Sequence, residues 1–87
     1  MLSAARPYLE RALAIREQVL SPIHPDTATS LNSLGVLLQT MGALQAARSY
    51  YERALTIAKV ALGINDPTTV LYRENYHRLL QQLNEQQ

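Results

Sequence analysis

Apolar residues recur at three- and four-residue spacing along four stretches of the chain, and this periodicity predicts amphipathic helices rather than strands. We expect the helices at about 3–20, 25–41, 43–62 and 66–84. Pro22 and Pro25 separate the first two stretches, because proline cannot continue a helix and biases the residue before it toward extended geometry. Gly42 and Gly63 close the second and third stretches. The pattern therefore predicts an all-α fold of four helices joined by short turns.

The residues at the expected helix starts suit the first turn of a helix. Ser3 and Asp66 are the expected N-caps of the first and fourth helices, since a short polar side chain can accept a hydrogen bond from a free backbone N–H. Pro25 and Pro67 fit the first helical position, where the missing N–H is not needed. His24 precedes a proline at the start of the second helix, so we interpret it as a capping or turn residue rather than a metal ligand.

The second helix has one packed face with a glycine in the middle of it. The packed residues are Ala28, Leu31, Leu34, Gly35 and Leu38. A glycine inside a helix costs roughly 1 kcal/mol relative to alanine, so we expect Gly35 to let another helix approach closely. The fourth helix is expected to bury Val70, Tyr76, Leu79, Leu80 and Leu83.

The first helix carries two apolar rows. Leu2, Ala5, Leu9 and Ala12 form one row, and Tyr8, Ala12, Ile15 and Val19 form the other. Together they make an apolar surface wider than a helix with one neighbour requires. We therefore expect neighbours on both sides of this helix.

A segment of the first helix is repeated in the third. Residues 4–15 read AARPYLERALAI and residues 46–57 read AARSYYERALTI, an offset of 42 positions. The same offset pairs Pro25 with Pro67 and Leu38 with Leu80. Self-similarity at a fixed period is the sequence signature of a helical repeat protein.

Composition narrows the classes of partner. The chain has 87 residues and a net charge of +1 without a basic or acidic block, so we expect neither nucleic acid nor a membrane surface as a partner. It contains no cysteine, which excludes disulfides and thiolate metal sites. No stretch approaches the roughly 18 apolar residues of a membrane span, and the first residues do not resemble a signal peptide. We expect a soluble cytoplasmic protein.

No constellation of residues points to catalysis. The glycines are isolated and follow no predicted strand, so they do not form a phosphate-binding loop. Ser21, His24 and Asp26 lie together at a turn, but nothing near them supplies an oxyanion hole or a pocket. We expect no catalytic, metal or cofactor site, and we do not expect an enzyme.

The central residues resemble a tetratricopeptide repeat. The matching positions are Leu31, Leu34, Gly35, Leu38, Gly42, Leu44, Ala47, Tyr51 and Ala54. The 42-residue period resembles the longer unit of kinesin light chains, as do the segments HPDTATSLNSLG and YERALAIREQVL. The resemblance implies an α-solenoid of antiparallel helix hairpins, with the second helix of a partial unit at 1–22, one full hairpin at 25–64 and a C-terminal capping helix at 66–84.

The same resemblance implies that the first helix of each unit lines a concave groove that binds a peptide or a partner protein. The groove candidates are Thr29, Asn32, Val36 and Gln39 from the second helix, and Glu74, Arg78 and Gln81 from the fourth. The amide of Asn32 can hydrogen-bond an extended peptide backbone or can simply be solvated. Glu74 would repel the C-terminal carboxylate that some tetratricopeptide modules bind, so that mode of binding is disfavoured.

Self-association is the alternative function. The first helix lacks the helix that would precede it in a full unit, so the row including Leu2, Ala5, Leu9 and Ala12 is expected to be uncovered in a monomer. An uncovered apolar row favours a homodimer, or an oligomer in which helices are exchanged between copies.

Overall fold

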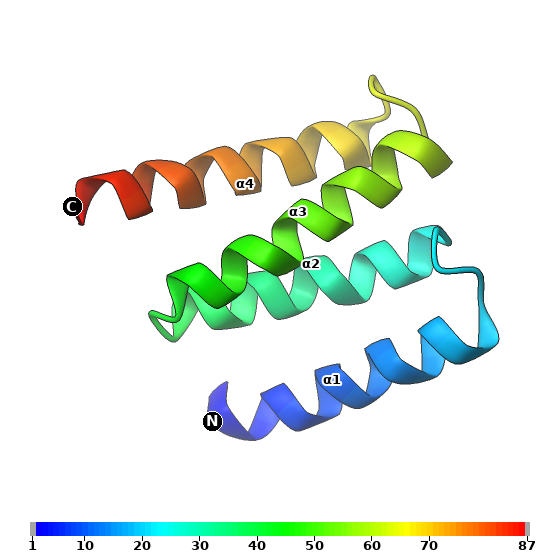
Figure 1. Cartoon of the computed structure of the whole chain (residues 1–87), viewed down its shortest axis with the longest axis horizontal. Coiled ribbons are helices and arrows are strands. Elements are labelled where there is room, and N and C mark those ends of the chain that lie inside the picture. Colours follow the sequence, from blue (N-terminus) through cyan, green and yellow to red (C-terminus); the bar gives the residue numbers. More distant parts are fainter. Residues whose placement is uncertain (1, 87) are drawn as a thin grey trace.

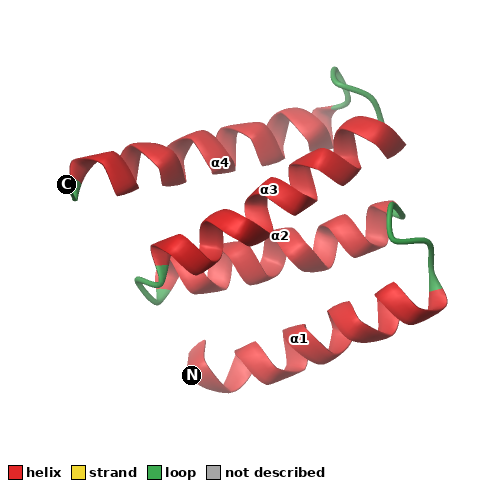
Figure 2. Cartoon of the chain, viewed as in Figure 1, coloured by secondary structure: helices red, strands yellow, loops and turns green. Residues whose placement is uncertain are grey.

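A computed structural model describes residues 2–86, with the burial of side chains described for residues 4–86. It contains four helices, α1 (Leu2–Val19), α2 (Pro25–Thr40), α3 (Leu44–Ala61) and α4 (Pro67–Glu85), joined by short turns. No strand occurs in the described residues (Figure 2). The all-α fold of four helices and their approximate positions are confirmed.

The helices form a thin stack in chain order. Each helix packs against the next one along the chain, so α2 and α3 are in the interior of the stack and α1 and α4 are at its two ends (Figure 1). The stack measures 37 × 32 × 16 Å. None of the helices in the described residues is both long enough and apolar enough to span a membrane.

The predicted caps at the starts of α2 and α4 are confirmed. The His24 Nδ1 atom accepts a hydrogen bond from the Asp26 N–H at 3.0 Å, and the Asp66 Oδ1 atom accepts one from the Thr68 N–H at 2.8 Å. The prediction that Ser3 caps the first helix is wrong, because α1 already begins at Leu2. Gly42 lies two residues after the end of α2, in the turn to α3. Its φ of 86° is in the left-handed region that glycine adopts without strain.

The core lies between α2 and α3. The predicted packed face of α2 is confirmed, since Ala28, Leu31, Leu34, Gly35 and Leu38 are all buried. Gly35 does permit a close approach, and the group that approaches is the ring of Tyr51 on α3. A methyl group added at Gly35 would lie 2.8 Å from the Tyr51 Cδ1 atom. This is shorter than packed carbon atoms allow.

The prediction for the buried face of α4 is only partly correct. Leu79 is buried, whereas the other predicted residues, Val70, Tyr76, Leu80 and Leu83, are half-buried. Thr69 and Tyr72 are buried instead. The difference arises because α4 is at the end of the stack and has neighbouring helices on one side only, so only a narrow face of the helix is fully covered.

The uncovered row of α1 is not the predicted one. Leu9 packs against the core, Leu13 is buried, and Ala5 and Ala12 are half-buried. The side chain of Leu2 lies outside the described residues. The second row is the exposed one, with Tyr8 at 74%, Ile15 at 52% and Val19 at 75% exposure. The reason is the orientation of α1, because the helix is rotated so that Leu9 faces α2 and the second row faces away from it.

Candidate functional site

Three side-chain hydrogen bonds join α2 to α4, and we call these residues the α2–α4 seam. Tyr72 Oη donates to Thr29 Oγ1 at 3.4 Å, Asn75 Nδ2 donates to Asn32 Oδ1 at 3.3 Å, and Gln39 Nε2 donates to Gln82 Oε1 at 2.9 Å. The partners in every pair are 43 residues apart. A constant separation requires that α2 and α4 run in the same direction, displaced by about one repeat.

The seam is anchored to α3 through Tyr51. The Tyr51 hydroxyl donates a hydrogen bond to Gln39 Oε1 at 2.7 Å, and the Gln39 amide nitrogen then donates to Gln82. Burial raises the pKa of the Tyr51 phenol, while the positive charge of Arg78 lowers it to a smaller extent. The phenol therefore keeps its proton at neutral pH and remains a hydrogen-bond donor. Three helices are thus linked by one chain of polar side chains.

The predicted groove residues differ in how far they are free to contact a ligand. Thr29, Val36, Glu74, Arg78 and Gln81 are exposed, and Asn32 and Gln39 are half-buried. Asn32 and Arg78 come together through a third residue, because Asn75 donates to Asn32 and accepts a hydrogen bond from Arg78. The amide oxygen and nitrogen of Gln39 both take part in internal hydrogen bonds, so Gln39 supports the seam from within.

The α4 candidates border a hollow of their own. Glu74, Arg78 and Gln81 line a shallow cavity of about 500 Å³ together with His77 and Leu80. All of these residues belong to α4, and no α2 candidate lines this cavity. The structure therefore connects the two groups of candidates only through Asn75, which binds both Asn32 and Arg78, and it does not bring them together in one enclosed pocket.

Three seam residues were not predicted from the sequence. Tyr72, Asn75 and Gln82 contact α2 at a separation of 43 residues, whereas the internal copy has an offset of 42. At the repeat offset of 42, the residue equivalent to Asn75 is Ser33, so the repeat alone does not point to the contact between Asn75 and Asn32. A search for amides one position beyond the repeat offset would have found two of the three.

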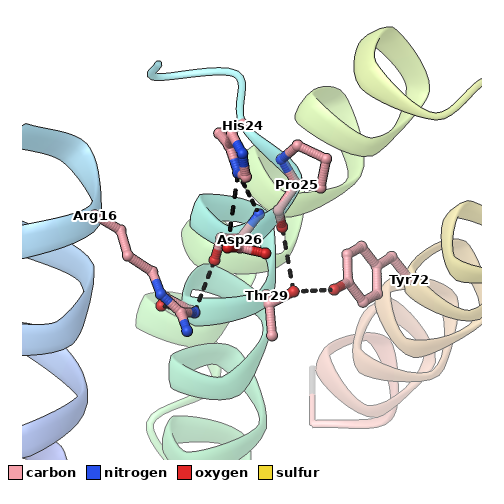
Figure 3. A network of polar contacts seen from close by, with 7 residues as sticks. Arg16, His24, Pro25, Asp26, Thr29 and Tyr72 are labelled. Carbon is pink, nitrogen blue, oxygen red and sulfur yellow. Dashed lines mark hydrogen bonds and ion pairs between the residues drawn. The ribbon is translucent and has the colours of Figure 1, made fainter. Parts of the chain in front are cut away.

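The turn between α1 and α2 lies at one end of the seam (Figure 3). Arg16 of α1 donates through Nη1 to the backbone oxygen of Asp26 at 2.9 Å and to Ser30 Oγ at 2.8 Å. Thr29 donates to the Pro25 backbone oxygen at 3.2 Å and accepts from Tyr72. Neighbouring residues at the start of α2 therefore make both links: Asp26 and Ser30 bind α1, and Thr29 binds α4.

The turn interpretation holds for Ser21, His24 and Asp26, which stabilise the backbone and form no catalytic arrangement in the described residues. The Ser21 hydroxyl oxygen accepts the Ile23 N–H at 3.3 Å, and His24 Nδ1 accepts the Asp26 N–H. These hydrogen bonds stabilise the turn and the start of α2. Within residues 2–86, no three histidine, aspartate or glutamate side chains come close enough to hold a metal ion.

The comparison with protein families identifies the repeat. Residues 2–59 match a family model described as Tetratricopeptide repeat, which covers α1, α2 and most of α3. A search of curated proteins found no match.

Proposed function

Because the chain belongs to the tetratricopeptide repeat family, whose members generally mediate protein–protein interactions, we propose that it is a scaffold module that binds an extended peptide segment along the α2–α4 seam. Repeats of this family are typically non-catalytic. The single observation that carries the proposal is the cluster of Asn32, Asn75 and Arg78, which sits on two parallel helices and combines amide and guanidinium donors.

The chemistry of the cluster suits a peptide backbone. The seam uses the Asn32 oxygen, whereas the hydrogen atoms of the Asn32 amide nitrogen take no part in the seam's hydrogen bonds. An amide nitrogen carries two donors, and an extended peptide presents a carbonyl oxygen on each side of its backbone in alternation. We expect Asn32 and Arg78 to donate to such carbonyl oxygens. Exposed Val36, one helical turn after Asn32 on α2, would contact an apolar side chain of the ligand.

The charge of the seam supports a neutral or mixed-charge ligand. The α2 contribution is uncharged, and α4 contributes Glu74 and Arg78, which have opposite signs. A carboxylate placed beside Arg78 would also lie near Glu74 on the same exposed surface of α4. Like charges in proximity oppose binding. The proposed ligand is therefore an internal segment of a protein and not an acidic C-terminal tail.

A double substitution tests this proposal. Peptides are selected from a random display library on the immobilised chain, and the affinity of the selected peptides is then measured by titration. We expect Asn32→Ala combined with Arg78→Ala to weaken binding about tenfold or more, because one hydrogen bond to a charged donor alone is worth roughly 1.5–3 kcal/mol. Helicity should stay unchanged, and the melting temperature should fall only modestly, because the variant also loses the hydrogen bonds of Asn32 and Arg78 to Asn75.

The control variant carries the same two types of substitution away from the seam. It combines Asn65→Ala with Arg11→Ala, and both residues are exposed. This variant should bind the selected peptides like the original chain. Equal affinity for the seam variant and the control would refute the groove assignment.

Self-association is a second candidate function, and the exposure of Tyr8, Ile15 and Val19 favours it. Three large apolar side chains on one face of a helix form a patch that association would bury. Light scattering during size-exclusion chromatography tests it. A monomer mass at every protein concentration would rule it out.

Two finer assignments also remain proposals. The 42-residue offset supports a unit of the kinesin-light-chain type, with segments at 1–22, 25–64 and 66–84. The cytoplasmic location expected from the sequence stays a prediction.

A further inference from the structure

We propose that the exposed row of α1, namely Tyr8, Ile15 and Val19, pairs with the same row of a second copy, with the two α1 helices antiparallel about a two-fold axis. This inference rests on the self-association proposed above and specifies its geometry. The axis passes close to Ala12 and Ile15, midway along the row.

The internal copy of this row shows that the fold covers such a surface when a neighbouring helix is available. Tyr8 and Ile15 correspond to Tyr50 and Ile57 of α3 at the 42-residue offset. Ile57 is only 8% exposed and Tyr50 packs against the core, whereas Ile15 is 52% and Tyr8 is 74% exposed. The side chains are identical in each pair, and only their neighbours differ. Tyr8 and Ile15 therefore match side chains that are covered in α3, whereas Val19 matches Ala61, which is exposed in α3 as well.

The outer end of the stack offers a poor partner for this row. A second copy could in principle dock its α4 on α1, in the way that α2 packs on α3. At the positions equivalent to Leu31 and Gly35 of α2, however, α4 carries Arg73 and His77. Leu31 is completely buried, so the same docking would bury the Arg73 guanidinium group, which donates to the Ile64 backbone oxygen. Burying that charge without an acidic partner is costly.

The α1 row is complementary to itself. In an antiparallel pair with the axis between Ala12 and Ile15, Tyr8 lies opposite Val19 of the second copy, and Ile15 lies opposite Ala12 of the second copy. Large side chains then meet smaller ones, which is the arrangement that packs two helices closely. Arg11, on one edge of the row, lies nearest to the uncharged Gln18 of the second copy, so no like charges meet directly across the interface. A two-fold pair uses the same patch on both copies and closes at a dimer.

Cysteine cross-linking tests this geometry, because the chain contains no cysteine of its own. Three alanines of α1 give matched single variants, Ala12→Cys, Ala4→Cys and Ala14→Cys. Ala12 lies near the proposed axis, Ala4 lies near the row but far from the axis, and Ala14 is exposed on another side of the helix. Under mild oxidation we expect Ala12→Cys to form a covalent dimer roughly tenfold faster or more than the other two, because pairing raises its effective concentration. Adding Tyr8→Glu should abolish this advantage.

The outcomes separate this geometry from self-association in general. A monomer mass at all concentrations, with equal cross-linking of the three variants, would overturn both. Fast cross-linking of Ala4→Cys would indicate parallel helices, and oligomers beyond the dimer would indicate head-to-tail docking through α4. Either result would overturn the antiparallel pair and leave self-association standing. Circular dichroism of each variant checks that the helices are retained.

Discussion

The contact between Gly35 and Tyr51 determines how closely α2 and α3 pack. The Tyr51 ring lies over Gly35, and a methyl group at that position would come within 2.8 and 2.9 Å of two ring carbons. Tyr51 is itself almost fully buried, and its hydroxyl is fixed by the hydrogen bond to Gln39. The ring therefore cannot move aside without breaking a polar contact in the seam.

We expect Gly35→Ala to destabilise the chain by about 1–2 kcal/mol. Alanine gains up to roughly 1 kcal/mol of helix propensity, but overpacking in a core typically costs about 1–3 kcal/mol and here prevails. Urea unfolding followed by circular dichroism measures the change in the free energy of unfolding. In a Tyr51→Leu background, which reproduces the residue at the equivalent position Leu9, the same substitution should be neutral or stabilising. An equal loss in both backgrounds would show that Tyr51 is not the cause.

The two junctions that connect a second helix to the following first helix have equivalent threonines, and only one of these makes a hydrogen bond. In the α3–α4 junction, the hydroxyl of Thr69 donates to the backbone oxygen of Ala58 at 3.2 Å. Thr27 is the equivalent residue of the α1–α2 junction, and its buried hydroxyl has no hydrogen-bond partner among the described residues. Arg16 connects α1 to α2 in its place, through a long side chain. The two junctions are thus fixed by different side chains, Arg16 in one and Thr69 in the other.

Replacing each threonine by valine should separate these roles. Thr69→Val keeps the shape of the side chain and removes the hydrogen bond, so we expect a loss of about 1 kcal/mol in the free energy of unfolding. Thr27→Val removes a hydroxyl that was buried without a partner, so it should be neutral or stabilising. Chemical denaturation of the two variants under identical conditions makes the comparison. Equal losses would mean that the Thr69 hydrogen bond contributes nothing specific.

The elements that sequence reasoning predicted well are those determined by local patterns. Proline and glycine positions place the helix ends, and the spacing of Ala28, Leu31 and Leu38 gives the packed face of α2. The exposed row of α1 could not be chosen in the same way. Both rows of α1 are apolar, and which of them faces α2 depends on how the helix is rotated against its neighbour.

The candidate site was predicted less completely than the helices. Thr29, Asn32 and Arg78 were named from the sequence because the resemblance to the repeat implies that they line its groove, which stays a prediction. Their partners on α4 were missed, since the seam joins residues at a separation that only the packing of the two helices fixes. Burial of Tyr72 was missed for a related reason, because the equivalent position in the preceding unit holds the small residue Ser30.

Across the whole molecule, Tyr51 joins the core to the seam. Its ring belongs to the core cluster that includes Leu38 and Leu79, and its hydroxyl begins the polar chain through Gln39 to Gln82. Helices α2, α3 and α4 all contribute to this arrangement. Loss of the phenol proton would therefore remove the hydrogen bond that joins α3 to α2 at Gln39.

Stability should therefore fall at alkaline pH because of Tyr51. Burial raises the pKa of its phenol above the usual value of about 10 for tyrosine, and the smaller effect of Arg78 does not reverse this. The folded chain thus binds the proton more tightly than the unfolded chain does. The resulting stabilisation is fully present below about pH 10 and is lost as the pH rises toward and through the raised pKa.

We expect the free energy of unfolding from urea titrations to decline over this range. The free energy of unfolding of the Tyr51→Phe variant should decline less steeply, although it starts lower at neutral pH. Tyr8→Phe, at an exposed position, is the matched control and should follow the original chain. A Tyr51→Phe variant that loses stability as steeply as the control would show that another group governs the alkaline transition.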